Sequence, residues 1–127
     1  MSTLKVSNVQ SNGSGFNDVV SFQNSSGTQN GTLCRAWVNF NGTGVVAISA
    51  SFNVSSITDN SAGNYTVNFS NAMSNANYSV VGNCSFTPSN VTLQSVFTGS
   101  RTTTTVVVTT VGSAYYDNDY VSISIFR

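Results

Sequence analysis

The sequence predicts an all-β protein, built as an antiparallel β-sandwich of jelly-roll-like or Ig-like type. Two observations lead to this prediction: apolar residues alternate with Ser, Thr and Asn in almost every segment, and short turn signals separate these segments. No stretch shows the periodicity of an amphipathic helix. At 127 residues, the chain suits one domain that is large enough to bury a core.

Each alternating run places its apolar side chains on one face, and we expect these faces to be buried. In chain order, the residues expected to point inward are Val46, Ile48, Ala50, Phe52 and Val54; Tyr65, Val67 and Phe69; Tyr78, Val80, Cys84 and Phe86; Val91, Leu93 and Phe97; Val121, Ile123 and Ile125. Turns are expected at residues 41–44, 59–63, 88–90 and 99–100, and from residue 112 onward.

Residues 102–110 form a strongly β-prone segment without charge or proline. On an exposed edge such a segment would promote aggregation. It could be a central strand of the monomer's sheet, or it could be buried by pairing in an intimate oligomer.

The first 33 residues differ from the rest, because residues 11–15 and 24–31 are polar and rich in Gly. We therefore divide the chain into an N-terminal arm, residues 1–33, and a β-sandwich head, residues 34–127. Residues 4–6 and 19–22 could form short strands within the arm. The arm is either a disordered tail or an attachment segment that orders on docking. Its candidate attachment residues are the apolar Leu4, Val6, Val9, Phe16 and Phe22.

Charge is scarce: the chain has four Lys and Arg, four Asp, no Glu and no His. Charged residues make up 6% of the sequence, against about 25% in average soluble proteins. Without a basic stripe, we expect neither nucleic-acid binding nor attraction to anionic membranes, and no apolar run is long enough for membrane insertion. A neutral surface of hydroxyl and amide groups favours self-association.

The same composition argues against catalysis, because the usual general bases and metal ligands are missing. We expect no enzyme activity, no metal and no other cofactor. Cys34 and Cys84 are expected to be free thiols, with a disulfide between them as the alternative. Cys84 is in phase with inward apolar neighbours.

One constellation suits recognition, in a turn-like segment near the C-terminus. Its candidate ligand-binding residues are Tyr115, Tyr116, Asp117, Asn118, Asp119 and Tyr120. Aromatic faces can stack on sugar rings while carboxylate and amide groups bond sugar hydroxyls. The competing interpretation is that the tyrosines pack on a neighbouring subunit or cap the sandwich. The run of Asp117, Asn118 and Asp119 lacks the spacing and the Glu of an EF-hand loop, so we interpret it as a turn.

Residues 35–44 (RAWVNFNGTG) and 48–60 (ISASFNVSSITDN) resemble the β-rich C-terminal domain of bacteriophage and prophage tail-fibre and tail-associated proteins. The similarity continues through residues 63–70 and 76–82 and returns in the ending, VSISIFR. The opening MSTLKV is similar to short starts of marine and cyanobacterial phage fibre proteins. The chain departs from the pattern at Ser74 and Asn75, where relatives often have a proline and an acid, and it has no long shaft.

The resemblance implies a homotrimer on a virion appendage without a catalytic centre, attached to other virion proteins through its N-terminal arm. A 127-residue chain fits a short fibre, a fibre tip or a decoration protein better than a full tail fibre. The expected function is adhesion to a host or environmental surface, with glycan as the candidate ligand. The alternative is a capsid or tail cement protein. The expected location is the virion, after synthesis in the host cytoplasm without a signal peptide.

Overall fold

The computed structural model describes residues 19–85, 94–112 and 114–127. Over these ranges the chain is all-β and contains no helix. The strands are β1 (Val19–Asn24), β2 (Gly27–Thr32), β3 (Cys34–Asn41), β4 (Ala47–Phe52), β5 (Val54–Ser61), β6 (Asn64–Phe69), β7 (Ser79–Ser85), β8 (Gln94–Arg101), β9 (Thr105–Val111) and β10 (Tyr120–Phe126). The predicted all-β class is confirmed.

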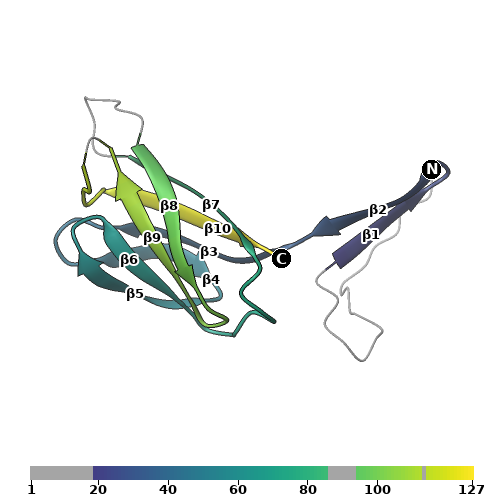
Figure 1. Cartoon of the computed structure of the whole chain (residues 1–127), viewed down its shortest axis with the longest axis horizontal. Coiled ribbons are helices and arrows are strands. Elements are labelled where there is room, and N and C mark those ends of the chain that lie inside the picture. Colours follow the sequence, from purple (N-terminus) through teal and green to yellow (C-terminus); the bar gives the residue numbers. More distant parts are fainter. Residues whose placement is uncertain (1–18, 86–93, 113) are drawn as a thin grey trace.

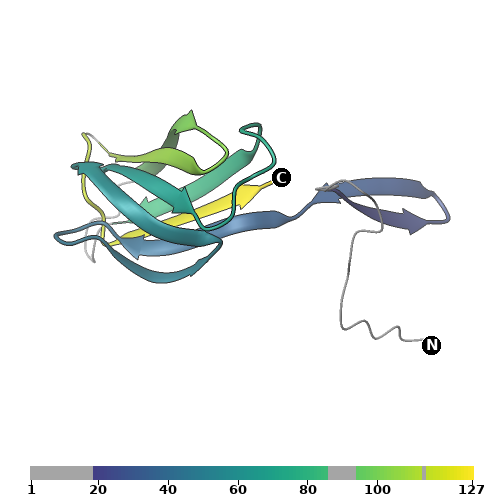
Figure 2. The ribbon, with the colours of Figure 1, turned by 90° about the horizontal axis from the view of Figure 1, so that it is seen from below.

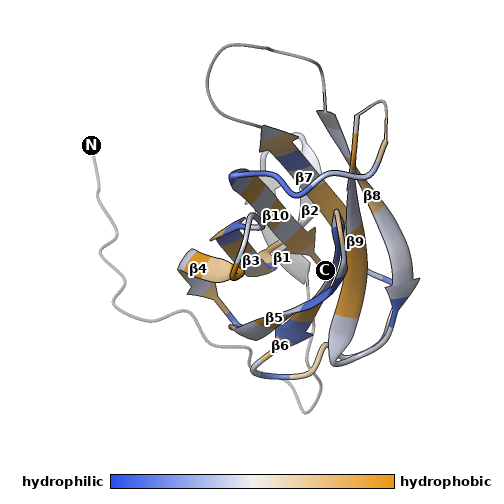
Figure 3. Cartoon of the chain, turned by 90° about the vertical axis from the view of Figure 1, so that its left-hand side faces the viewer, coloured by the Kyte–Doolittle hydropathy of each residue, from blue (hydrophilic) through white to orange (hydrophobic). Residues whose placement is uncertain are grey.

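Eight of these strands form one antiparallel sheet in the order β4-β3-β10-β7-β8-β9-β6-β5. The sheet curls around a common interior until it is nearly closed, as the end-on view in Figure 3 shows. Its two edge strands, β4 and β5, are consecutive in the chain and are separated only by Asn53, which has a positive φ of 54°. The predicted sandwich is therefore a single wrapped sheet whose opposite walls face each other across the core.

The core is formed by the inward side chains of the central strands, and here the predicted alternation is confirmed. The fully or almost fully buried apolar residues are Ala36, Val38 and Phe40; Val54; Tyr65, Val67 and Phe69; Met73 and Tyr78; Val106 and Val108; Val121, Ile123 and Ile125. Two edge-to-face ring pairs, Phe40 with Tyr65 and Phe69 with Tyr78, join opposite walls at centroid distances of 5.1 and 5.9 Å. Each large apolar side chain buried this way contributes about 1.5–3 kcal/mol.

Two of the expected buried faces are wrong. In the first of these, only the two ends of the run, Val46 and Val54, pack against the core. Ala50 and Phe52 face outward, opposite Asn39 and Trp37 of β3, and Phe52 is 55% accessible. Beyond a register shift, Ile48 lies opposite the buried Phe40 but is still 37% accessible, because β4 is an edge strand with a neighbour on one side only. In β8 the opposite face points inward: Val96 packs against the core and Phe97 is 57% exposed. Phe86, Val91 and Leu93 lie outside the described residues, as does the turn expected at 88–90.

The β-prone segment of residues 102–110 contributes β9, which lies between β8 and β6. Val106, Val108 and Thr110 have no exposed surface, so the interpretation as a central strand of the monomer is confirmed. The preceding turn is held by Thr102, whose Oγ1 accepts bonds from the Thr104 and Thr105 amides at 3.1 and 2.9 Å. The turn expected at residues 99–100 is wrong, because these residues continue β8.

Within the described part of the chain, β1 and β2 pair only with each other. This hairpin lies beyond one end of the eight-stranded sheet and is joined to β3 through Leu33 (Figures 1 and 2). The strand expected at residues 19–22 is confirmed, whereas residues 24–31, expected to be flexible, contain most of β2. Of the candidate attachment residues, Phe22 lies in β1, and Leu4, Val6, Val9 and Phe16 lie outside the described residues.

Cys34 and Cys84 are free thiols in this structure, in agreement with the first of the two expectations. Cys84 lies on the inward face of β7 and packs against the core, as its phase in the sequence predicted. Burial raises the pKa of the Cys84 thiol, since the thiolate would lose its hydration. This thiol is therefore a packing residue with low nucleophilic reactivity.

Candidate recognition site

The candidate ligand-binding residues lie in the connection from β9 to β10, at the end of the sheet opposite to the C-terminus and the β1–β2 hairpin (Figure 1). Two other turns meet this connection. The Gly42 amide, between β3 and β4, donates to the Asn118 carbonyl at 2.8 Å. The amide of Gly63, in the β5–β6 turn, donates to Oδ1 of Asp117 at 2.7 Å. The loop is thus tied to two separate hairpins.

Asp117 is the main anchor of this loop. Its Oδ1 accepts one hydrogen bond from the Gly63 amide and one from the Tyr65 hydroxyl, both at 2.7 Å. Tyr65 has no exposed surface. Burial, followed by the hydrogen bond to Asp117, raises the pKa of the Tyr65 hydroxyl well above its ordinary value. The Asp117 carboxyl therefore serves the interior of the protein rather than a ligand.

Asn118 is also an internal residue, with no exposed surface. Its Nδ2 donates to the Tyr116 carbonyl at 2.9 Å, and the Thr110 hydroxyl donates to the same carbonyl. The Asn118 Oδ1 is buried without a hydrogen-bond partner. Gly42 permits the close approach of this loop, because a Cβ at that position would collide with the Tyr65 hydroxyl.

The tyrosines, in contrast, point outward. Tyr115 and Tyr120 are each 63% exposed and Tyr116 is 45% exposed, while Asp119 is half-buried. In the single chain these rings are therefore displayed to solvent, and their packing on a neighbouring subunit stays a prediction. The six candidate residues divide into two groups: three displayed aromatic rings, accompanied by Asp119, and two polar residues that fix the backbone beneath them.

Sequence reasoning did not find the residues that hold this loop. Tyr65 was recognised only as a core residue, and Gly63 only as a turn residue, although both bond to Asp117. Thr110 is fully buried because its hydroxyl reaches the Tyr116 carbonyl. The one sequence signal for this role is that Thr110 is a polar residue in phase with the apolar, inward residues Val106 and Val108.

The chemistry of the site is that of a binding surface. Tyrosine rings provide flat apolar faces together with a hydroxyl that can donate or accept a hydrogen bond. Across residues 19–85, 94–112 and 114–127, no three His, Cys, Asp or Glu side chains gather in a way that could hold a metal ion. The arrangement suits noncovalent contact with a flat, uncharged ligand.

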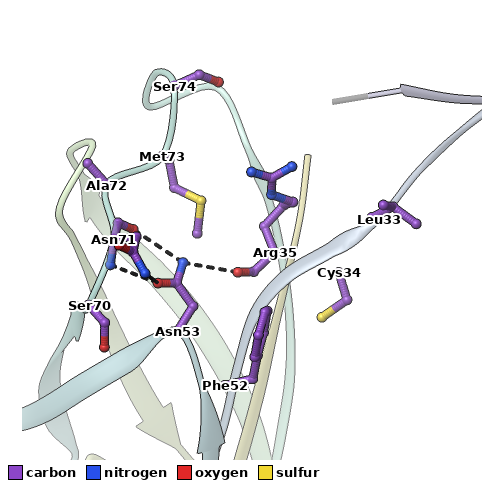
Figure 4. A pocket seen from close by; sticks show the side chains of 10 residues that line it. All are labelled: Leu33, Cys34, Arg35, Phe52, Asn53, Ser70, Asn71, Ala72, Met73 and Ser74. Carbon is purple, nitrogen blue, oxygen red and sulfur yellow. Dashed lines mark hydrogen bonds between the residues drawn. The ribbon is translucent and has the colours of Figure 1, made fainter. Parts of the chain in front are cut away.

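A hollow of about 630 Å³ lies at the other end of the sheet (Figure 4). Its lining residues are Leu33, Cys34, Arg35, Phe52, Asn53, Ser70, Asn71, Ala72, Met73 and Ser74. Asn53 holds its walls together: Nδ2 donates to the carbonyls of Arg35 and Asn71 at 3.1 and 3.2 Å, and Oδ1 accepts from the Asn71 amide at 2.7 Å. Nothing in the sequence distinguished Asn53 from the other asparagines, because its positive φ becomes apparent only in the structure.

Comparison of this chain with protein-family models, with curated proteins and with solved structures finds no match. Among the described residues, no helix is long and apolar enough to cross a membrane.

Proposed function

We propose that this chain is a non-enzymatic phage virion protein of the short-fibre or fibre-tip type, which adheres to a host or environmental surface. The observation that carries the proposal is the display of Tyr115, Tyr116 and Tyr120 on a loop fixed by internal hydrogen bonds. This loop lies at the end remote from the N-terminal hairpin, so it is free to meet a surface when the other end is held (Figure 2).

A glycan is the ligand class that this loop fits best. The rings can stack on the apolar faces of sugars, and their hydroxyls can bond sugar hydroxyls without burying a charge. Because Asp117 and Asn118 fix the backbone before binding, little loop ordering opposes association. A protein with zero net charge also neither attracts nor repels a neutral polysaccharide over long range.

The test uses the full chain with Tyr115, Tyr116 and Tyr120 changed together to Ser, on an array of bacterial surface polysaccharides and on whole bacteria. Each ring that stacks should contribute about 0.5–1.5 kcal/mol, so the triple variant should bind at least tenfold more weakly. The matched control is Thr58→Ser on β5, an exposed residue on the outer face far from the loop. If the folded triple variant binds like the control, the tyrosines are not the adhesive surface.

A cement protein of a capsid or tail is the second candidate, favoured by the β1–β2 hairpin, which projects as a sheet of its own. In that role the hairpin end would clamp neighbouring virion subunits, and no host ligand would exist. The full chain would then bind purified particles, the triple tyrosine variant would bind them equally well, and the polysaccharide array would give no signal. Retained particle binding together with loss of polysaccharide binding in the variant would support adhesion instead.

A further inference from the structure

The outer face of the sheet carries a row of apolar side chains that the core does not use. In the strand registers, Trp37 on β3 is opposite both Phe52 on β4 and Ser124 on β10, and Ser124 is opposite Val81 on β7. Residues directly opposite one another in antiparallel strands project to the same face. Phe52, Trp37, Ser124 and Val81 therefore lie side by side across four strands.

Phe97 on β8 extends this row. The register pairs Asn83 with Ser95, and an extension of this register by two residues along each strand places Val81 opposite Phe97. The approach of Gly82 to Val96 supports this alignment, since a Cβ on Gly82 would lie 3.3 Å from the Cβ of Val96. We call Phe52, Trp37, Val81 and Phe97 the outer apolar row.

The outer apolar row is open to solvent. Phe52, Val81 and Phe97 are 55%, 59% and 57% exposed. Trp37 is partly exposed although its neighbours Ala36 and Val38 are fully buried, which places its ring on the outside. The next row on the same face is uncharged and, apart from Ala50, polar; its members are Ala50, Asn39, Ser122, Asn83 and Ser95.

The opposite wall of the barrel shows that the outer apolar row is a local feature. On the outer face of β5 and β6, the side-chain Nδ2 of Asn68 donates to the hydroxyls of Ser56 and Thr58 at 3.1 and 3.0 Å. The side-chain Nδ2 of Asn60 likewise donates to the Thr66 hydroxyl at 3.0 Å. That wall satisfies its polar groups internally, so the apolar side chains are concentrated on the wall of β4, β3, β10, β7 and β8.

We propose that the outer apolar row is the surface through which copies of this chain associate with one another. The row and the uncharged row beside it carry no charge of their own, so a second copy can face them without like-charge repulsion. The half-exposed rings and valine present on the order of 300 Å² of apolar surface, which fits the core of an interface of about 800 Å² per partner. Aromatic residues at the centre with an uncharged polar rim are typical of such interfaces.

This inference goes beyond the proposed function and does not depend on what the tyrosine loop binds. The test measures the solution mass of the full chain by light scattering over a range of concentrations. The native protein should have a multiple of the 13.3 kDa chain mass, and Val81→Thr with Phe97→Thr should shift the mass to 13.3 kDa at the same concentration. The matched control is Val45→Thr, a 92% exposed valine outside the row, which should leave the mass unchanged.

A second measurement needs no variant. Trp37 is the only tryptophan of the chain, so its emission should shift to longer wavelength on dilution, in step with the loss of mass. A native oligomer whose mass is unchanged by the double substitution, or whose Trp37 emission stays constant while it dissociates, would overturn the inference and leave the adhesive function standing. A native protein that remains monomeric at high concentration would overturn both the inference and the homotrimer that the family resemblance implies.

Discussion

Replacement of Asp117 by alanine should lower the free energy of unfolding by about 3 kcal/mol, although Asp117 belongs to a surface loop. The carboxyl accepts the Gly63 amide and the Tyr65 hydroxyl, each at 2.7 Å. Loss of this acceptor leaves the Gly63 amide without a hydrogen-bond partner, which costs about 1–3 kcal/mol for a buried donor. The Tyr65 hydroxyl can instead donate to the Gly42 carbonyl, which is 3.3 Å away in the native protein, so the loss of its hydrogen bond to Asp117 should cost only about 1 kcal/mol.

Urea denaturation followed by Trp37 fluorescence measures this change. Asp59→Ala is the control, because it removes the same group from an exposed position of β5 that is opposite Tyr65 in the register, and it should stay within about 0.5 kcal/mol of the native protein. A double-mutant cycle with Tyr65→Phe should give a coupling of about 1 kcal/mol between the carboxyl and the hydroxyl. If Asp117→Ala is no more destabilising than Asp59→Ala, the loop is not held by this carboxyl and the preorganisation argument for the tyrosines fails.

Two further predictions concern pH and packing. Burial and then the hydrogen bond to Asp117 raise the pKa of the Tyr65 hydroxyl, so the folded protein keeps this proton at a pH where the unfolded chain, with an ordinary tyrosine pKa near 10.0, releases it. The free energy of unfolding should therefore be insensitive to Tyr65 below pH 10.0 and should fall as the pH rises above it. Equilibrium unfolding of Tyr65→Phe from pH 8 to 11 should show a shallower fall than the native protein, and an equal slope would contradict the assignment. Gly82→Ala should destabilise the protein by about 1–3 kcal/mol in thermal unfolding, because the new Cβ would lie 2.7 Å from Ile123 Cδ1 and 2.9 Å from the Ser122 carbonyl oxygen. A variant as stable as the native protein would show that β7 and β10 have room to separate.

The sequence was sufficient to predict the strand class and most of the core, because a period of two is a local property of the chain. It predicted the buried faces of β6 and β10 through residues such as Tyr65 and Ile123. It failed for Ile48 and Phe52, whose alternation has the same form, because β4 is an edge strand and a register shift in its pairing with β3 turns Phe52 to the outer face. Which strand becomes an edge depends on the order of pairing, and the order is set by contacts between distant segments.

The sequence predicted which segment forms the candidate site but not how its side chains are arranged. The three tyrosines are displayed, yet Asp117 and Asn118, which lie between Tyr116 and Tyr120, point into the protein. The partners of Asp117, Gly63 and Tyr65, lie 54 and 52 residues earlier in the chain. No local pattern shows that an aspartate will bond to groups so far away, and therefore composition alone favoured a ligand role for residues that the fold uses itself.

The position of Asn53 has a consequence for how the barrel can open. Since β4 and β5 are both edges of the sheet and consecutive in the chain, the ring is closed there by a covalent link without a ladder of hydrogen bonds. A chain cut at this corner would leave β4 attached through β3 alone, while the other seven strands would keep every ladder that they now have. The barrel thus has a seam between β4 and β5, where it can open without the loss of a β-ladder.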